Sequence, residues 1–178
     1  MYRIVASITS LELHAAALAS GTDAHRPRNC PHCHSIKLWG HGFYHRKIER
    51  IPIAKGSFNP VAIARYLCAA CLHTCSRLPL CIAPRRWHNW AVQQFVLLLI
   101  LTGSSVRHCS NCSGIGARTV RRWRDWLRQR GEFFAFHLRS RFANLGREPD
   151  VPALWRRVMR SMGLDVAMAW LDQDLFVP

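Results

Sequence analysis

Acidic residues are scarce in this sequence: aspartate and glutamate together number 10 in 178 residues, against 25 lysines and arginines. With histidine neutral, the formal net charge is +15. This balance favours a polyanionic partner, because each phosphate that a basic side chain neutralises releases a counterion. A basic surface that only aids solubility, or one that binds a membrane, is the alternative. Arginine dominates the basic residues, and its forked guanidinium favours specific contacts to phosphate and guanine.

Long apolar runs are also missing. The longest, Phe95–Leu101, is far too short to span a bilayer. The first 19 residues make a poor signal peptide, because Glu12 and His14 interrupt them and Arg3 is their single basic residue. Hydrophobic residues nevertheless make up 49% of the chain, which excludes a disordered tail and fits one domain or two small ones. We expect a cytoplasmic protein without a membrane partner.

Eight cysteines could form four disulfides in a secreted protein, but four of them form two Cys-x-x-Cys motifs. Each motif directs two thiolates at one point, and two motifs complete the tetrahedral shell that zinc prefers. The 34 residues between the motifs can hold a hairpin of strands. The sequence therefore predicts a reducing environment and a structural Zn²⁺ bound by Cys30, Cys33, Cys68 and Cys71.

Neighbouring donors leave other ligand sets open: His73 or Cys75 in place of Cys71, and His32 or His34 in place of Cys33. A third Cys-x-x-Cys, formed by Cys109 and Cys112, has no partner pair nearby. It could bind a second metal, but we expect both thiols, like that of Cys81, to be small buried apolar groups.

Periodicity and turn residues predict an α+β fold. Leucines at helical spacing predict a helix over 11–18, ended by Gly21. Strand patterns cover 37–46, 49–53 and 61–67. Helices are predicted over 88–101, 104–112, 118–130 (closed by Gly131), 153–162 and 164–171. The expected domains are an N-terminal helix and linker at 1–27, a zinc ribbon at 28–84, a three-helix helix-turn-helix unit at 85–131 and a helical tail at 132–178.

The helix predicted over 118–130 has two different faces. On a helical wheel, Val120, Trp123 and Leu127 fall together and form a core stripe. Arginines spread over the opposite arc, as in a recognition helix that enters a major groove. The residues expected to contact DNA are Arg118, Thr119, Arg121, Arg122, Arg124, Arg128 and Arg130.

Within this set, Arg121 and Arg122 are expected to reach base edges, and Arg124 and Arg130 to contact phosphates. A solvated, arginine-rich surface helix is the alternative. From Arg118 to Arg160 the chain holds 12 arginines and 4 acidic residues, a local excess of +8.

Two stretches resemble a known arrangement. The first runs from Cys30-Pro-His-Cys33 through Trp39-Gly-His-Gly-Phe-Tyr-His-Arg46 to Arg65-Tyr-Leu-Cys-Ala-Ala-Cys71 and Thr74-Cys-Ser76, and it resembles the N-terminal zinc ribbon of insertion-sequence transposases. The second, Gly114–Trp123, is similar to the helix-turn-helix that follows the ribbon in such proteins and in their small accessory proteins. Cys75 departs from the family pattern, which has an aromatic residue at this position, and so does the Cys109/Cys112 pair.

The resemblance implies a DNA-binding protein of a mobile element, but the family's acidic catalytic triad has no counterpart here. The acids after residue 131 occupy fewer than 50 residues and carry no alternating strand pattern. We therefore expect no enzyme, but a transposase accessory protein, a regulator or a truncated transposase. Its expected partners are double-stranded DNA and a separate catalytic transposase. A zinc-dependent module that binds RNA or protein is the alternative, and a thiol redox protein or remnant nuclease is a third class.

Overall fold

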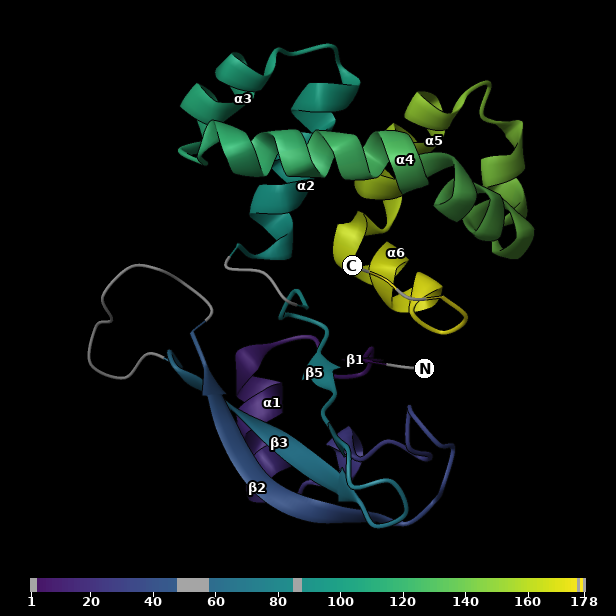
Figure 1. The fold of residues 1–178 in the computed structure, drawn as a ribbon. Helices are drawn as coiled ribbons and strands as arrows, with labels where there is room; N and C mark the ends of the chain where they lie inside the picture. The colour runs from purple at the N-terminus through teal and green to yellow at the C-terminus, as the bar shows by residue number, and fades with distance from the viewer. Residues whose placement is uncertain (1–2, 48–57, 85–87, 176, 178) are drawn as a thin grey trace. The chain divides into compact units, whose positions relative to one another are not determined.

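A computed structural model describes the chain except residues 1–2, 48–57, 85–87, 176 and 178 (Figure 1). The chain divides into two compact units. The cysteine-cluster unit comprises Met1–Asn89 and Asp172–Pro178, and the helical unit comprises Trp90–Leu171. The first holds small sheets and the second holds helices, so the predicted α+β class is confirmed.

A three-stranded antiparallel sheet, in the order β2-β3-β4, forms the centre of the cysteine-cluster unit. A second, two-stranded sheet pairs β1 with β5 in parallel. The predicted strand 49–53 lies outside the described residues. In chain order the elements are β1 (Ile4–Val5), α1 (Leu11–Ala19), the 3-10 helix η1 (Asp23–His25), β2 (Leu38–Arg46), β3 (Val61–Cys68), β4 (Thr74–Cys75) and β5 (Leu78–Pro79).

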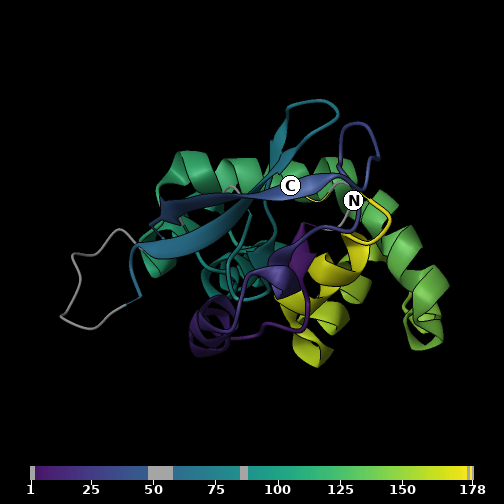
Figure 2. The same ribbon diagram turned by 90° about the horizontal axis from the view of Figure 1, so that it is seen from below.

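Strand β3 is covered on both faces, but over different parts of its length. Tyr66 and Cys68 lie on one face and pack with Leu38, Cys30 and Leu18 of α1. Figures 1 and 2 show α1 lying along one side of the β2–β3 pair. The opposite face is covered at the start of the strand, where Val61 and Ile63 pack with Leu78 and Ile82. Further along this second face, Arg65 and Leu67 are only half-buried.

Two buried histidines join α1, η1 and β3. His14 Nε2 lies 2.8 Å from the carbonyl oxygen of Ala62, and His14 Nδ1 lies 2.8 Å from His25 Nε2. A carbonyl only accepts, so His14 donates from Nε2 and accepts at Nδ1 from the Nε2–H of His25. In this arrangement His25 Nδ1 carries no hydrogen, and this buried nitrogen has no hydrogen-bond partner. A second proton on the His25 ring would therefore have no acceptor among the described residues.

Acid is expected to destabilise the cysteine-cluster unit through His25. Burial, followed by the nearby charges of His14 and Arg77, lowers the pKa of His25 from 6.5 to about 4. Between these values the unfolded chain binds a proton that the folded chain excludes, so stability falls as the pH drops from 6.5 to 4. The full loss is about 3 kcal/mol.

Urea unfolding of the wild type and of His25→Gln, at pH 7 and pH 4, measures this effect. The glutamine amide can replace the N–H that His14 accepts, but it does not titrate in this range. Other titrating groups contribute equally to both proteins, so the wild type should lose about 3 kcal/mol more than the variant. Equal losses would show that the histidine pair does not control acid stability.

The helical unit is built around α2, which contacts α3, α4, α5 and α6. None of the helices that the structure describes is long and apolar enough to cross a membrane. The elements are α2 (Trp90–Leu101), α3 (Val106–Ser113), α4 (Ala117–Arg141), the 3-10 helix η2 (Ala143–Arg147), α5 (Val151–Ser161) and α6 (Gly163–Leu171).

The prediction that Gly131 ends the arginine-rich helix is wrong. Helix α4 has 25 residues and continues to Arg141, so the boundary predicted at 131 falls inside it. Gly131 faces the core, where the indole N–H of Trp155 donates to its carbonyl oxygen at 3.0 Å. A Cβ at Gly131 would lie 3.3 Å from both Trp155 Nε1 and Leu127 Cδ1. Glycine serves here as the residue that allows close approach, not as a helix cap.

The C-terminal segment completes the cysteine-cluster unit. Asp172 is fully buried, and its carboxylate accepts from the backbone N–H groups of Arg3 and Ile4. The Arg3 guanidinium lies 3.8 Å from the same carboxylate and donates to the Val177 carbonyl oxygen. Burial raises the pKa of Asp172, although these bonds oppose the shift. The start of β1 is thus held by residues almost a whole chain away.

Candidate metal centre and basic helix

The structure brings together the four cysteines predicted as ligands. All four sulfur atoms lie within 4.8 Å of one another. The Sγ atoms of Cys30 and Cys71 are 3.5 Å apart, as are those of Cys33 and Cys68. Four thiolates placed tetrahedrally at about 2.3 Å from a central ion are about 3.8 Å apart, so the cluster is compatible with a metal site.

Two turns with the same backbone bonds hold these sulfurs. In each turn the first cysteine accepts, at its carbonyl, from the residue four positions later: His34 to Cys30 and Leu72 to Cys68, both at 2.9 Å. In each turn the N–H of the first cysteine donates to the carbonyl five positions later. His34 and Leu72 also share a positive φ, 59° and 60°. The cluster is therefore set by two equivalent backbone loops.

The thiols of the cluster do not ionise independently. Burial raises the pKa of Cys68, but hydrogen bonds from the backbone N–H groups of Cys71 and Ala70 outweigh it and lower the pKa to about 6. A backbone hydrogen bond from His73 lowers the pKa of Cys71, but burial and the neighbouring thiols raise it to about 12. Cys68 therefore ionises more readily than Cys71, and a bound cation would favour the thiolate form of its ligands.

Three of the other candidate ligands, His32, His73 and Cys75, make contacts of their own. His32 stacks on His73, with ring centroids 4.1 Å apart, and His73 Nδ1 lies 2.9 Å from the Cys71 carbonyl oxygen. Cys75 is buried in the core under the sheet. Burial, followed by the charges of Cys30 and Cys68, raises the pKa of Cys75 to about 11. Among the described residues, the donor atoms that cluster are those of the four predicted cysteines.

All eight cysteines are free. The expectation of buried thiols holds for Cys109, which is fully buried, but it is wrong for Cys112, which is exposed. Cys112 Sγ lies 3.5 Å from Nε2 of His108, one helical turn earlier. Residues three apart are neighbours on a helix surface, but Cys109 is the residue that α3 buries.

A short, tightly held turn connects α3 to α4. Ser105 caps α3 by accepting from the His108 N–H, and Gly114 ends the helix with a left-handed φ of 69°. Between the helices, Ile115 is buried, and its carbonyl oxygen accepts from the Ser110 hydroxyl at 2.7 Å. The turn is therefore fixed by an apolar anchor and by a hydroxyl of α3, which sets where α4 begins.

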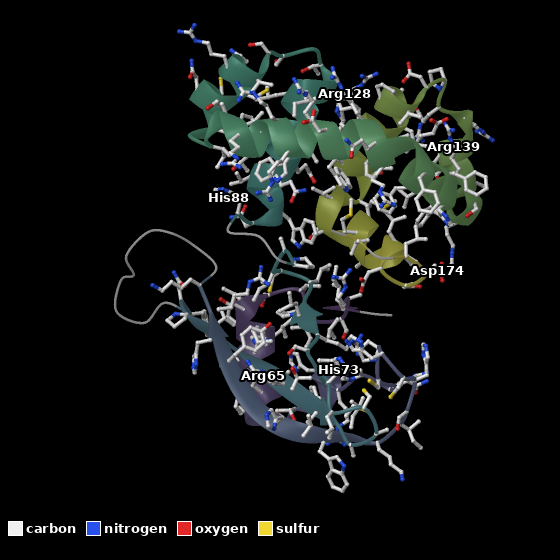
Figure 3. All side chains as sticks on the ribbon, viewed as in Figure 1. Arg65, His73, His88, Arg128, Arg139 and Asp174 are labelled. Carbon is white, nitrogen blue, oxygen red and sulfur yellow. The ribbon has the colours of Figure 1, made fainter. Side chains whose placement is uncertain are left out.

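Helix α4 presents the two faces that its sequence predicts. Val120, Trp123 and Leu127 are buried. Arginines 118, 121, 122, 128 and 130 are exposed, while Thr119 and Arg124 are half-buried. Arg124 differs from the others because its guanidinium donates twice to the Asp125 carboxylate, at 2.9 and 3.0 Å. Figure 3 shows the Arg128 side chain extending away from the axis of α4.

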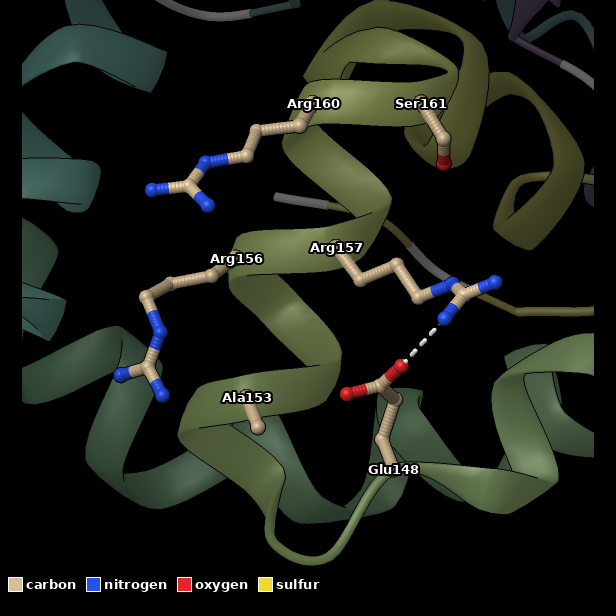
Figure 4. A pocket seen from close by; sticks show the side chains of 6 residues that line it. All are labelled: Glu148, Ala153, Arg156, Arg157, Arg160 and Ser161. Carbon is tan, nitrogen blue, oxygen red and sulfur yellow. Dashed lines mark hydrogen bonds and ion pairs between the residues drawn. The ribbon is translucent and has the colours of Figure 1, made fainter.

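Helix α5 adds a basic surface that the sequence pattern did not assign. Arg156, Arg157 and Arg160 line an open pocket of about 420 Å³ together with Glu148, Ala153 and Ser161 (Figure 4). Arg157 pairs with Glu148 at 2.8 Å, and Arg156 donates to the carbonyl oxygen of Leu101 at 3.0 Å. The signal in the sequence was their spacing from Arg160, since residues four and three positions apart, as Arg156 and Arg157 are from it, are neighbours on a helix surface.

Comparison with protein-family models, with curated proteins and with solved structures found no match to this chain.

Proposed function

We propose that this chain is a DNA-binding protein in which a zinc-stabilised unit accompanies a helix-turn-helix that reads duplex DNA. The observation that carries the proposal is α4, because its buried stripe holds it in the helical unit while its first turns present exposed arginines. The pair α3–α4 and the three-residue turn with its buried Ile115 fit a helix-turn-helix. Arg118, Arg121 and Arg122 would then lie where recognition helices reach base edges.

Zinc is the metal that suits the cysteine cluster best. Four thiolates in a closed tetrahedral arrangement are typical of structural zinc sites, which leave no open position for substrate. Cys30 and Cys68 are buried, so the site lies against the core of its unit. When bound, zinc would supply folding free energy and fix the two cysteine turns; the proposed DNA contacts come from α4.

Association with a mobile element is the more specific part of the proposal. It rests on the resemblance of the cysteine-containing stretches and of Gly114–Trp123 to insertion-sequence transposases. With the acids after residue 131 so few and so close in sequence, the chain would act as an accessory, a regulator or the DNA-binding part of a transposase. Its partners would be duplex DNA and a catalytic transposase, in the cytoplasm.

A variant with both Arg121→Ala and Arg122→Ala is expected to lose base preference. Each bidentate contact from arginine to a base provides about 1–3 kcal/mol of discrimination. Selection from randomised duplexes, followed by fluorescence anisotropy at 50–200 mM salt, measures both preference and affinity. The wild-type affinity should fall at least about 100-fold over this salt range, given about five phosphate contacts.

Arg130→Ala is the matched control, because Arg130 is exposed on the same helix but lies beyond its first turns. This variant should bind all sequences more weakly and reduce the salt slope by about 1, without altering base preference. A wild-type preference retained by the Arg121/Arg122 variant, or equal affinity for duplex RNA, would contradict the proposed reading of DNA by α4.

A further inference from the structure

Trp39 is an unusually exposed tryptophan on an edge strand. Its side chain is 66% exposed, although large aromatic residues are normally well buried. Strand β2 lies at the edge of the sheet, where Trp39 pairs with Leu67 and Leu67 pairs with Thr74. Paired residues share a face, so these three side chains form one row across the sheet. The row lies opposite the face on which Tyr66 and Cys68 pack with Leu18 of α1, because these two residues alternate with Leu67.

A cation and a second aromatic ring lie beside this row. Arg65 is two residues before Leu67 on β3 and therefore shares its face. Its guanidinium carbon lies 5.3 Å from the centroid of the Tyr44 ring. Figure 3 shows Arg65 on the sheet and His73 near the turn before β4. Lys37, just before β2, is exposed. The open face thus combines a flat apolar ring with positive charge.

The charges around this face identify the chemistry of its ligand. Strands β2, β3 and β4 contain no aspartate or glutamate, and Glu49 is the single acid between Asp23 and Asp125. Such a surface attracts an anion, and the exposed indole favours an anion that carries flat rings. A nucleic acid has both properties. In a duplex the ring faces are stacked inside, whereas in a single strand they are free to stack on an aromatic side chain.

We propose that this open sheet face, formed by Trp39, Arg65, Tyr44 and Lys37, binds single-stranded nucleic acid. A base stacks on the indole of Trp39, and the flanking phosphates lie against Arg65 and Lys37. This binding is additional to duplex reading by α4 and does not depend on it. Together the two surfaces would suit DNA that is double-stranded at one place and unpaired at another.

The test is binding of a fluorescein-labelled dT15 oligonucleotide by the full zinc-loaded chain, measured by fluorescence anisotropy. Trp39→Ala is expected to weaken dT15 binding roughly 5- to 100-fold, the usual effect of removing one stacking ring. Trp39→Phe keeps a ring and should recover much of the affinity. Phe136→Ala is the matched control, because Phe136 is 67% exposed on α4, and it should bind as the wild type does.

Two further readouts separate this proposal from its rivals. Bound dT15 should quench tryptophan emission in the wild type, and the quenching should be largely lost in Trp39→Phe. Trp39→Ala should also weaken dT15 binding by the same factor in a protein that carries Arg121→Ala and Arg122→Ala. The effect of Trp39 can therefore be measured even if α4 does not read duplex DNA. Unchanged dT15 binding by Trp39→Ala would overturn the proposal. So would a poly-glutamate peptide that competes as well as unlabelled dT15, since the face would then bind acidic protein.

Discussion

Cys68→Ser is expected to abolish metal binding and unfold the cysteine-cluster unit. Cys68 is fully buried at the end of β3, so its thiolate joins the sheet to the cluster. A structural metal site contributes on the order of 10 kcal/mol to folding, and three remaining thiolates cannot complete a tetrahedral shell. This change is the largest that we expect from any single substitution in the chain.

Metal content per chain, measured by mass spectrometry, and circular dichroism together test this expectation. The wild type should carry one zinc per chain, and a strong chelator should reproduce the effect of Cys68→Ser. Cys112→Ser is the control, because Cys112 is a free, exposed cysteine outside the cluster. It should keep its zinc and its fold. If Cys68→Ser retains the wild-type zinc content, the four sulfurs are not the ligands.

Trp155→Ala is expected to destabilise the helical unit by about 3–5 kcal/mol, the usual cost of removing a buried aromatic side chain. Trp155 is fully buried, packs against Trp126 with ring centroids 6.0 Å apart, and donates to the Gly131 carbonyl. The substitution leaves a cavity where α5 meets the middle of α4. The C-terminal half of α4, which begins near Gly131, would then lose its packing against α5.

Urea denaturation of Trp155→Ala, Trp155→Phe and Trp170→Ala separates the contribution of the buried ring from that of the hydrogen bond. The phenylalanine variant keeps most of the ring but loses the hydrogen bond, so it should lose less stability than the alanine variant. Trp170 is 38% exposed, and its replacement should cost much less than that of Trp155. Equal losses for Trp155→Ala and Trp170→Ala would show that the contact with Gly131 does not support the unit.

Local chemistry explains what could be predicted from the sequence. Two Cys-x-x-Cys turns carry their geometry within a few residues each, so the set of four clustered sulfurs was predictable. The same holds for the buried stripe of Val120, Trp123 and Leu127. The stripe and each cysteine turn depend on hydrogen bonds or periodicity within one short segment, and the four ligands that zinc requires pair the two turns.

Features that depend on distant residues were missed or assigned wrongly. Glycine often ends a helix, but Gly131 lies inside α4, where it allows Trp155 to approach the backbone. The sequence did carry a signal that the helix continues, because the apolar stripe extends to Phe134, Ala135 and Leu138. The contact between His14 and His25, and that of His14 with the Ala62 carbonyl of β3, join three segments that are separate in the sequence. The exposure of Trp39 could not be predicted, because it depends on which stretches of each sheet face are covered by segments distant in the sequence.

The buried carboxylate of Asp172 has a consequence for how the protein is made. It receives the backbone N–H of Ile4, 168 residues earlier, and the whole helical unit lies between them. Ribosomes add about 5–20 residues per second, so Ile4 waits roughly 10–30 s for this partner to be synthesised. All of the helical unit is synthesised within that interval, because its last helix ends at Leu171. The hydrogen bonds that hold the start of β1 can therefore form only after the helical unit has been synthesised.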